Sequence, residues 1–192
     1  MRDGGGWTFR RLAFEPHYDA EAVAEFPGDG NWPCPEFCFE HDGSVVADPV
    51  LRRGTPLIVQ VTPFSAPEWV GVFPAGGLGV VNGVFGTPAP DKMIVVVDGA
   101  AYLLAAVAPE AGALLLHEQV NQVVPVAGMP LLLLAGSTDI VAVGPQGVAW
   151  RSPRLGMDDL RVLDANQSGI RCSVAALGGH PVPIVLHPAL GQ

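Results

Sequence analysis

Two cysteines and a histidine lie close together near the N-terminal end of the chain. Cys34, Cys38 and His41 form the pattern C-x3-C-x2-H, and thiolate and imidazole are the ligands that zinc prefers in a tetrahedral site. His17 or Asp42 would supply the fourth ligand. On a strand, however, alternate side chains point to opposite faces, so the histidine would point away from both thiols. We therefore expect ordinary packing of the cysteines and no metal site.

A second group that could do chemistry lies in the C-terminal part. Asp158 and Asp159 are adjacent, and with His180 they would make an acid–base or metal cluster. An adjacent aspartate pair after a glycine is more often a turn or a bulge, and we favour that interpretation. The chain has no G-x-S-x-G, H-E-x-x-H, P-loop or G-x-G-x-x-G pattern after a strand. We therefore assign no catalytic residue and no cofactor.

Tryptophan and arginine, which are enriched at binding hot spots, occur together at Trp150, Arg151 and Arg154. One hypothesis is a recognition surface, with Trp150, Arg154 and Asp158 as candidate binding residues. The alternative is that Trp150 fills the core and Arg154 pairs with Asp158 across a turn. We favour the alternative because tryptophan is commonly well buried.

The negative charge is concentrated in one stretch. Residues 15–48 contain nine acidic residues and no lysine or arginine, whereas the whole chain has a net charge of −9. Such a field disfavours nucleic-acid binding and favours a basic protein or a cation as partner. Glu21, Glu25 and Glu36 are the candidate binding residues of this stretch. The alternative is that these acids only keep a protein of low charge in solution.

The elements that must position these residues are predicted to be short strands. The chain has 24 glycines and 19 prolines, and they separate short runs of Val, Ile, Leu and Phe, as in many-stranded β proteins. Asp42-Gly43 is a strong hairpin signal, and residues 19–26 fit either a helix or a strand. The uninterrupted runs IVVV and LLLL indicate strands covered on both faces. The predicted strands span residues 36–40, 44–47, 56–62, 69–73, 80–85, 92–97, 101–107, 114–117, 122–126, 131–135, 139–143, 148–152, 160–163, 170–175 and 183–187.

A short echo indicates an internal repeat. The sequence VNGVF at residues 81–85 returns as VNQVV at residues 120–124. An apolar strand, a turn and a second strand follow each copy. A period of about 40 residues suits the blades of a β-propeller or the repeats of a β-trefoil.

The sequence from residue 147 carries a further pattern, G-x-x-W-x-S-x-R-L followed by D-x-L. Its positions are Gly147, Trp150, Ser152, Arg154, Leu155, Asp158 and Leu160. With residues 67–73 and 81–85, this pattern resembles small uncharacterised bacterial proteins of propeller-like all-β structure, over roughly residues 67–190. The chain departs from the pattern at Met157 and Asp159, where an aromatic residue and a glycine are expected. The resemblance implies a fold and no activity.

Composition and segment lengths limit the cellular setting. Hydrophobic residues make up 49% of the chain, enough for a buried core, but no apolar run approaches the roughly 20 residues that cross a bilayer. The first residues lack a signal-peptide pattern, and three cysteines do not form a disulfide framework. We therefore expect a cytoplasmic protein that binds neither membrane nor nucleic acid.

These observations combine into one prediction. We expect a single all-β, mainly antiparallel domain, propeller-like or sandwich-like, with at most one short helix. An acidic N-terminal segment, residues 1–66, would pack on a repeat-built part, residues 67–192, and a second copy of the chain, as a homodimer, is one way to cover an open edge. The expected function is a non-enzymatic binding or interaction module. The alternatives are an acidic immunity- or inhibitor-type protein that masks a basic partner and, third, a small hydrolase or metal-dependent enzyme.

Overall fold

The computed structural model describes residues 9–23, 26–27, 31–47, 54–76, 79–175 and 180–191. The described residues form an all-β, mainly antiparallel structure, as the sequence predicts. Only two strand pairs in these ranges are parallel, β1 with β7 and β3 with β6. The one helical element among the described residues is the 3-10 turn η1, Pro109–Ala111.

Four sheets contain the strands. The first sheet is ordered β2 (Tyr18–Val23), β5 (Leu57–Pro63), β6 (Trp69–Phe73), β3 (Glu36–Phe39) and β4 (Val45–Val46). The second is ordered β1 (Phe9–Arg10), β7 (Gly83–Gly86), β8 (Lys92–Val97), β9 (Ala100–Ala105) and β10 (Leu114–His117). The third is β11 (Gln122–Pro125), β12 (Leu132–Ala135), β13 (Ile140–Gly144) and β14 (Gly147–Arg151). The fourth is β15 (Asp158–Asn166), β16 (Gly169–Ala175) and β17 (Pro181–Leu186).

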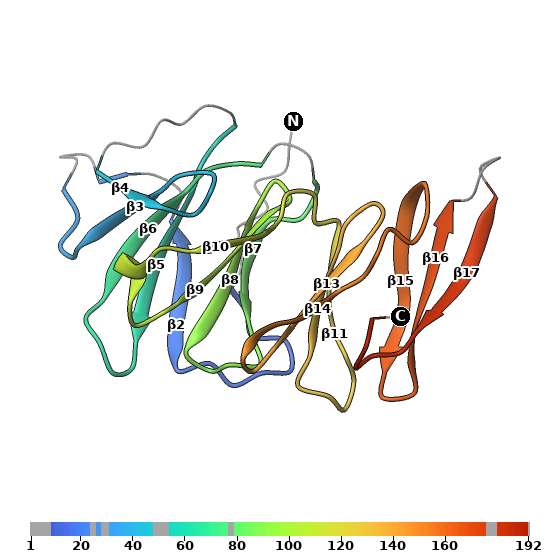
Figure 1. Ribbon diagram of the computed structural model, residues 1–192. Coiled ribbons are helices and arrows are strands. Elements are labelled where there is room, and N and C mark those ends of the chain that lie inside the picture. Colours follow the sequence, from blue (N-terminus) through green and yellow to red (C-terminus); the bar gives the residue numbers. More distant parts are fainter. Residues whose placement is uncertain are drawn as a thin grey trace.

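The sheets stand face to face in a row that follows the order of the chain (Figure 1). Three apolar layers fill the spaces between them. Tyr18 and Val95 belong to the layer between the first and second sheets, and Ile94 and Leu134 to the layer between the second and third. Leu133 belongs to the layer between the third and fourth. Inner strands with uninterrupted apolar runs are therefore buried on both faces, as predicted.

Strand β2 resolves the ambiguity over residues 19–26. Tyr18, Ala20 and Ala22 pack in the first apolar layer, whereas Asp19 and Glu21 are exposed. This alternation has the period of a strand. Residues 24 and 25 lie outside the described residues.

The echo between Val81 and Val120 coincides with a repeat of strand pairing. Met93 pairs with both Gly86 and Leu104 in the second sheet, and Leu132 pairs with both Pro125 and Val143 in the third. Each of these three residues of the third sheet follows its counterpart in the second sheet by the same number of residues that separates the two copies of the echo. The second and third sheets therefore share one register over three strands.

The asparagines of the echo explain why the motif recurs. Asn82 accepts a hydrogen bond from the backbone N–H of Asp98 and donates to its carboxylate at 3.2 Å. Asn121 donates to the hydroxyl of Ser137 at 3.1 Å. In each repeat, these bonds tie the residue before the first strand to the turn that follows the second strand.

The two repeats differ in their last connection. In the third sheet only Pro145 and Gln146 separate β13 from β14, and the strands pair up to Gly144 and Gly147. In the second sheet the longer segment 106–113 separates β9 from β10 and includes η1. Strand β10 therefore begins opposite Leu103 and leaves the last residues of β9 without a β10 partner.

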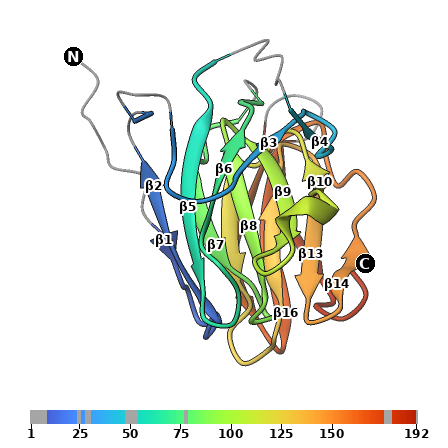
Figure 2. The ribbon, with the colours of Figure 1, turned by 90° about the vertical axis from the view of Figure 1, so that its left-hand side faces the viewer.

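Figure 2 looks along the row with the first sheet toward the viewer. The two ends of the row differ in how much of their outer faces is exposed. In the first sheet Ile58, Val70 and Val72 face away from the second sheet, yet at most 5% of each is exposed. In the fourth sheet Leu163 and Val185 remain 64% and 66% exposed. The first sheet is thus covered over the middle of its outer face, whereas the outer face of the fourth sheet is open.

Candidate functional site

The acidic candidates Glu21 and Glu36 lie on one face of the first sheet. The register places Glu21 opposite Gln60, Gln60 opposite Val70, and Val70 opposite Glu36. The two carboxylates therefore share one row across the outer face, and both residues are exposed. Glu68 joins this row through a hydrogen bond from the Gln60 side chain. Glu25, the third candidate, lies outside the described residues.

The C-x3-C-x2-H residues do not converge on one point. Cys38 lies on the outer face of the first sheet, where its thiol is 3.4 Å from a Glu36 carboxylate oxygen. His41 lies elsewhere, with Nδ1 3.4 Å from the Tyr102 hydroxyl and Nε2 4.0 Å from the Glu118 carboxylate. Burial raises the pKa of Cys34, and the negative charge of Glu68 raises it further. The described residues contain no cluster of three or more potential metal ligands.

The aspartate pair forms a bulge. Asp159 has a φ of 52°, and the register of β15 with β16 shifts between Asp158 and Arg161. Asp158 pairs with Ala175, and Ala175 in turn pairs with Pro181. Two strand spacings, about 10 Å, therefore separate the backbone of Asp158 from that of β17, which His180 precedes.

Trp150 and Arg154 lie at the junction of the third and fourth sheets. The Trp150 indole packs against the apolar layer between them and donates a hydrogen bond to the Pro188 carbonyl at 2.8 Å. Arg154 donates to the carbonyl oxygens of Gly156 and Met157, each at 2.9 Å. Its expected pairing with Asp158 is therefore replaced by bonds to backbone carbonyls, because these carbonyls lie within its reach at the turn.

A partly buried histidine next to an aspartate is a feature that sequence reasoning missed. His117 Nε2 is 3.4 Å from the Asp139 carboxylate, and the backbone N–H of Gln119 donates to Nδ1 at 2.9 Å. The ring lies over Gly136, where an added Cβ would come within 2.4 Å of it. Both ring nitrogens thus have partners, so His117 has no free lone pair with which to act as a general base.

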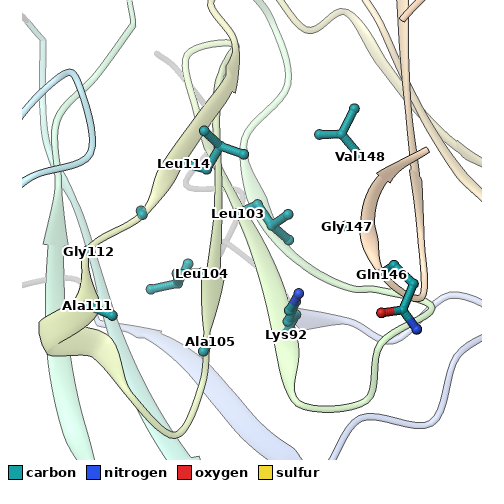
Figure 3. Close-up of a pocket in the computed structure, with 11 residues that line it drawn as sticks. Lys92, Leu103, Leu104, Ala105, Ala111, Gly112, Leu114, Gln146, Gly147 and Val148 are labelled. Atoms are coloured by element: carbon teal, nitrogen blue, oxygen red, sulfur yellow. The ribbon is translucent and has the colours of Figure 1, made fainter. Parts of the chain in front are cut away.

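A groove of about 450 Å³ lies between the second and third sheets (Figure 3). It exists because β10 begins late, so that Leu104 and Ala105 of β9 form part of its wall. The β13–β14 turn forms the opposite side. The lining consists of Lys92, Leu103, Leu104, Ala105, Ala111, Gly112, Ala113, Leu114, Gln146, Gly147 and Val148.

The side chains that line the groove are mainly aliphatic, with one charged group at Lys92 and one amide at Gln146, and polar atoms form part of its surface. Leu103 and Leu104 are buried, whereas Leu114 and Val148 are 54% and 38% exposed. Lys92 is the one lysine of the chain, and no hydrogen bond or ion pair joins its ammonium group to any described residue. Figure 3 shows Lys92 beside Leu103, between the β9–β10 side and the β13–β14 turn. This arrangement can hold an apolar molecule that carries a negative charge.

One signal in the sequence could have singled out Lys92, although not the groove. Lys92 begins the apolar strand KMIVVV, and the equivalent position in the second copy of the echo is Leu131. A lysine at the position of a repeat leucine departs from the apolar pattern that the two copies otherwise share. The groove itself depends on where β10 begins, and the sequence did not predict that position together with the facing turn.

No family model, curated protein or solved structure matches the chain. In the described ranges, no helix has the length and hydrophobicity required to span a bilayer.

Proposed function

We propose that this protein is a non-enzymatic binding module and that its binding site is the groove between the second and third sheets. The observation that carries the proposal is the Lys92 ammonium group, which has no partner among the described residues, in a groove whose other side chains are mainly aliphatic. Its volume of about 450 Å³ falls in the range of small-molecule sites, in which a few polar groups among apolar side chains orient the ligand. His117 has no free ring nitrogen, which favours binding over acid–base catalysis.

A propeller-like arrangement of the sheets in a cytoplasmic bacterial protein is part of this proposal. The shared register of the second and third sheets supports blade-like units of about 40 residues. Because each sheet packs face to face on the next, a groove can form where the last strands of two neighbouring sheets are separated. At the proposed site, the long β9–β10 connection separates the edge of the second sheet from the β13–β14 turn of the third.

The test is a ligand screen by methyl NMR. A set of small apolar and amphiphilic compounds is added to protein with labelled Leu and Val methyl groups. Binders should shift the methyl signals of Leu103, Leu114 and Val148, while those of Leu163 and Val185 on the open fourth sheet stay in place as internal controls. A screen in which no compound shifts the groove methyls would refute the proposal.

A second candidate function rests on the acidic row of the first sheet. Glu21 and Glu36 are exposed in one row, which supports an immunity- or inhibitor-type protein that masks a basic partner. Opposite charges would speed association, and added salt would slow it. The competing interpretation is a solubilising surface.

A charge-neutralised variant separates these two interpretations. Glu21→Gln, Glu25→Gln and Glu36→Gln are combined, and association with a lysine-rich peptide is measured at low and high salt. A docking face predicts slower association in the variant than in a control with Asp158→Asn and Asp159→Asn. Equal association by both variants, with lower solubility of the first, would leave only the solubilising role.

A further inference from the structure

The lining of the groove narrows the class of ligand, on the assumption that the proposed function is correct. We propose that the groove binds a single-chain aliphatic carboxylate, with the carboxylate on Lys92 and the chain along the leucines. The lining side chains, the charge of Lys92 and the leucine at the equivalent position of the third sheet each support this class of ligand.

The walls select a flexible aliphatic chain. No lining residue is aromatic, so a planar ring would find no ring to stack on. Leu103 offers aliphatic surface at the floor, and the exposed side chains of Leu114 and Val148 continue it to the rim. The Leu104 side chain packs on the opposite face of β9, in the layer between the first and second sheets. Burial of the exposed Leu114 and Val148 side chains by an alkyl chain would provide the driving force for binding.

The charge selects an anionic head group with a single negative charge. Lys92 is the only charged residue in the lining, and no described carboxylate pairs with it. One ammonium group balances one carboxylate. A phosphate monoester carries about 1.5 to 2 negative charges at neutral pH, and the lining has no second cation for the excess. The groove therefore fits a carboxylate better than a phosphate.

Comparison with the third sheet indicates that the lysine serves the groove and not the fold. The repeat position of Lys92 is Leu131, which is 6% exposed and packs in the apolar layer between the third and fourth sheets. A leucine at this position satisfies the fold of a repeat. The lysine occurs in the repeat whose final connection is long enough to leave a groove beside it.

The single lysine gives the test a direct readout. An amine-reactive reagent can modify only Lys92 and the chain's N-terminal amine, and peptide mass mapping distinguishes the two. Decanoate, below its micelle concentration, should protect Lys92 and leave the N-terminal amine reactive. Decanol, decyltrimethylammonium and decyl phosphate are the matched probes, and calorimetry measures their affinities for the groove.

Substitutions then assign the contacts. Lys92→Met should weaken decanoate binding about tenfold or more, because a hydrogen bond to a charged group is lost. Lys92→Arg should retain most of the affinity, and Leu114→Glu should abolish binding. Arg171→Met and Leu163→Glu, on the outer face of the fourth sheet, are the controls and should bind as the unmodified chain does. Circular dichroism establishes that each variant is folded.

The outcomes separate the two proposals. If decanol or decyltrimethylammonium binds in the groove as tightly as decanoate, the carboxylate inference is wrong and the binding module stands. If decyl phosphate binds more tightly, the head group is a phosphate and the inference is again wrong. If no alkyl probe protects Lys92 while the methyl screen finds other groove ligands, only the aliphatic class is refuted. An empty methyl screen refutes both proposals.

Discussion

The second and third sheets have the same register over three strands and differ in one connection. Only Pro145 and Gln146 join β13 to β14, whereas the longer segment 106–113 joins β9 to β10. In the third sheet the short turn lets the last strand cover its neighbour. In the second, the longer link exposes the end of β9 and creates a groove. Two repeats can therefore share the same strand pairing, and a longer loop in one of them is sufficient to open a groove beside it.

The largest predicted effect tests whether the two frames are equivalent. Leu134 and its repeat counterpart Val95 are both fully buried, each against the preceding sheet. Leu134→Ala should lower the free energy of unfolding by about 2–5 kcal/mol, with a smaller loss for Val95→Ala because valine is smaller. Chemical denaturation measures both, with the exposed Leu163→Ala as the control. A lower free energy of unfolding in only one of the two variants would show that the two sheets do not unfold as one cooperative core.

The next prediction concerns the strands at the outer edges of the two repeats. Strand β14 is held by Trp150, which packs against Gly191 and bonds to Pro188, whereas β10 is held by a hydrogen bond from Ala113 to the Gly43 carbonyl. Trp150→Ala should cost about 3 kcal/mol of unfolding free energy. An unchanged melting temperature with loss of partner binding would instead favour the recognition-surface hypothesis.

The equivalent asparagines of the two repeats should differ in how much they stabilise the fold. Asn82 makes two hydrogen bonds to Asp98, which has a φ of 44°, and Asn121 makes one to Ser137. Asn82→Ala should therefore cost about 1–3 kcal/mol, and Asn121→Ala about 0.5–1.5 kcal/mol. Thermal unfolding of the two variants side by side provides the measurement. The reverse order would mean that the turn at Asp98 does not depend on Asn82.

The smallest effect is a pH dependence outside the two repeats. Burial raises the pKa of Cys172, in the fourth sheet, to about 11. In the unfolded chain this thiol ionises at a lower pH, so above about pH 9 the unfolded state binds fewer protons and stability falls as pH rises. The contribution is at most about 1.4 kcal/mol per pH unit. Between about pH 8.5 and 9.5, where few unfolded tyrosines are ionised, stability should fall less steeply with pH in Cys172→Ala than in the unmodified chain, as measured by chemical denaturation.

The sequence predicted most of the fold because local patterns determined it. Short apolar runs between glycines and prolines predicted the strands at residues 69–73, 92–97 and 114–117 with their observed bounds. The turn at Asp42-Gly43 also formed as predicted, with Gly43 at a φ of 87°. The alternating Ala and acid residues of 18–23 left helix and strand equally open, because only packing against the second sheet distinguishes them.

The site was less predictable because it depends on contacts between distant segments. The groove requires Lys92, Leu114 and Val148 to meet across two sheets, and no local pattern records that meeting. The acidic row likewise depends on β3 pairing with β6 and β2 pairing with β5. The charge count identified the acids, but only the register placed Glu21 and Glu36 in one row.

The strand order of the sheets has a consequence for the order of folding. From β7 to β10, and again from β11 to β14 and from β15 to β17, each strand pairs with its neighbour in the chain. The first sheet instead pairs β2 with β5 and β3 with β6, and β1 joins β7 although the whole first sheet lies between them in the chain. Loop-closure entropy delays such distant contacts, whereas sequential hairpins close quickly. During synthesis the N-terminal strands emerge first, but they must wait for β7 and its sheet before they can complete the row.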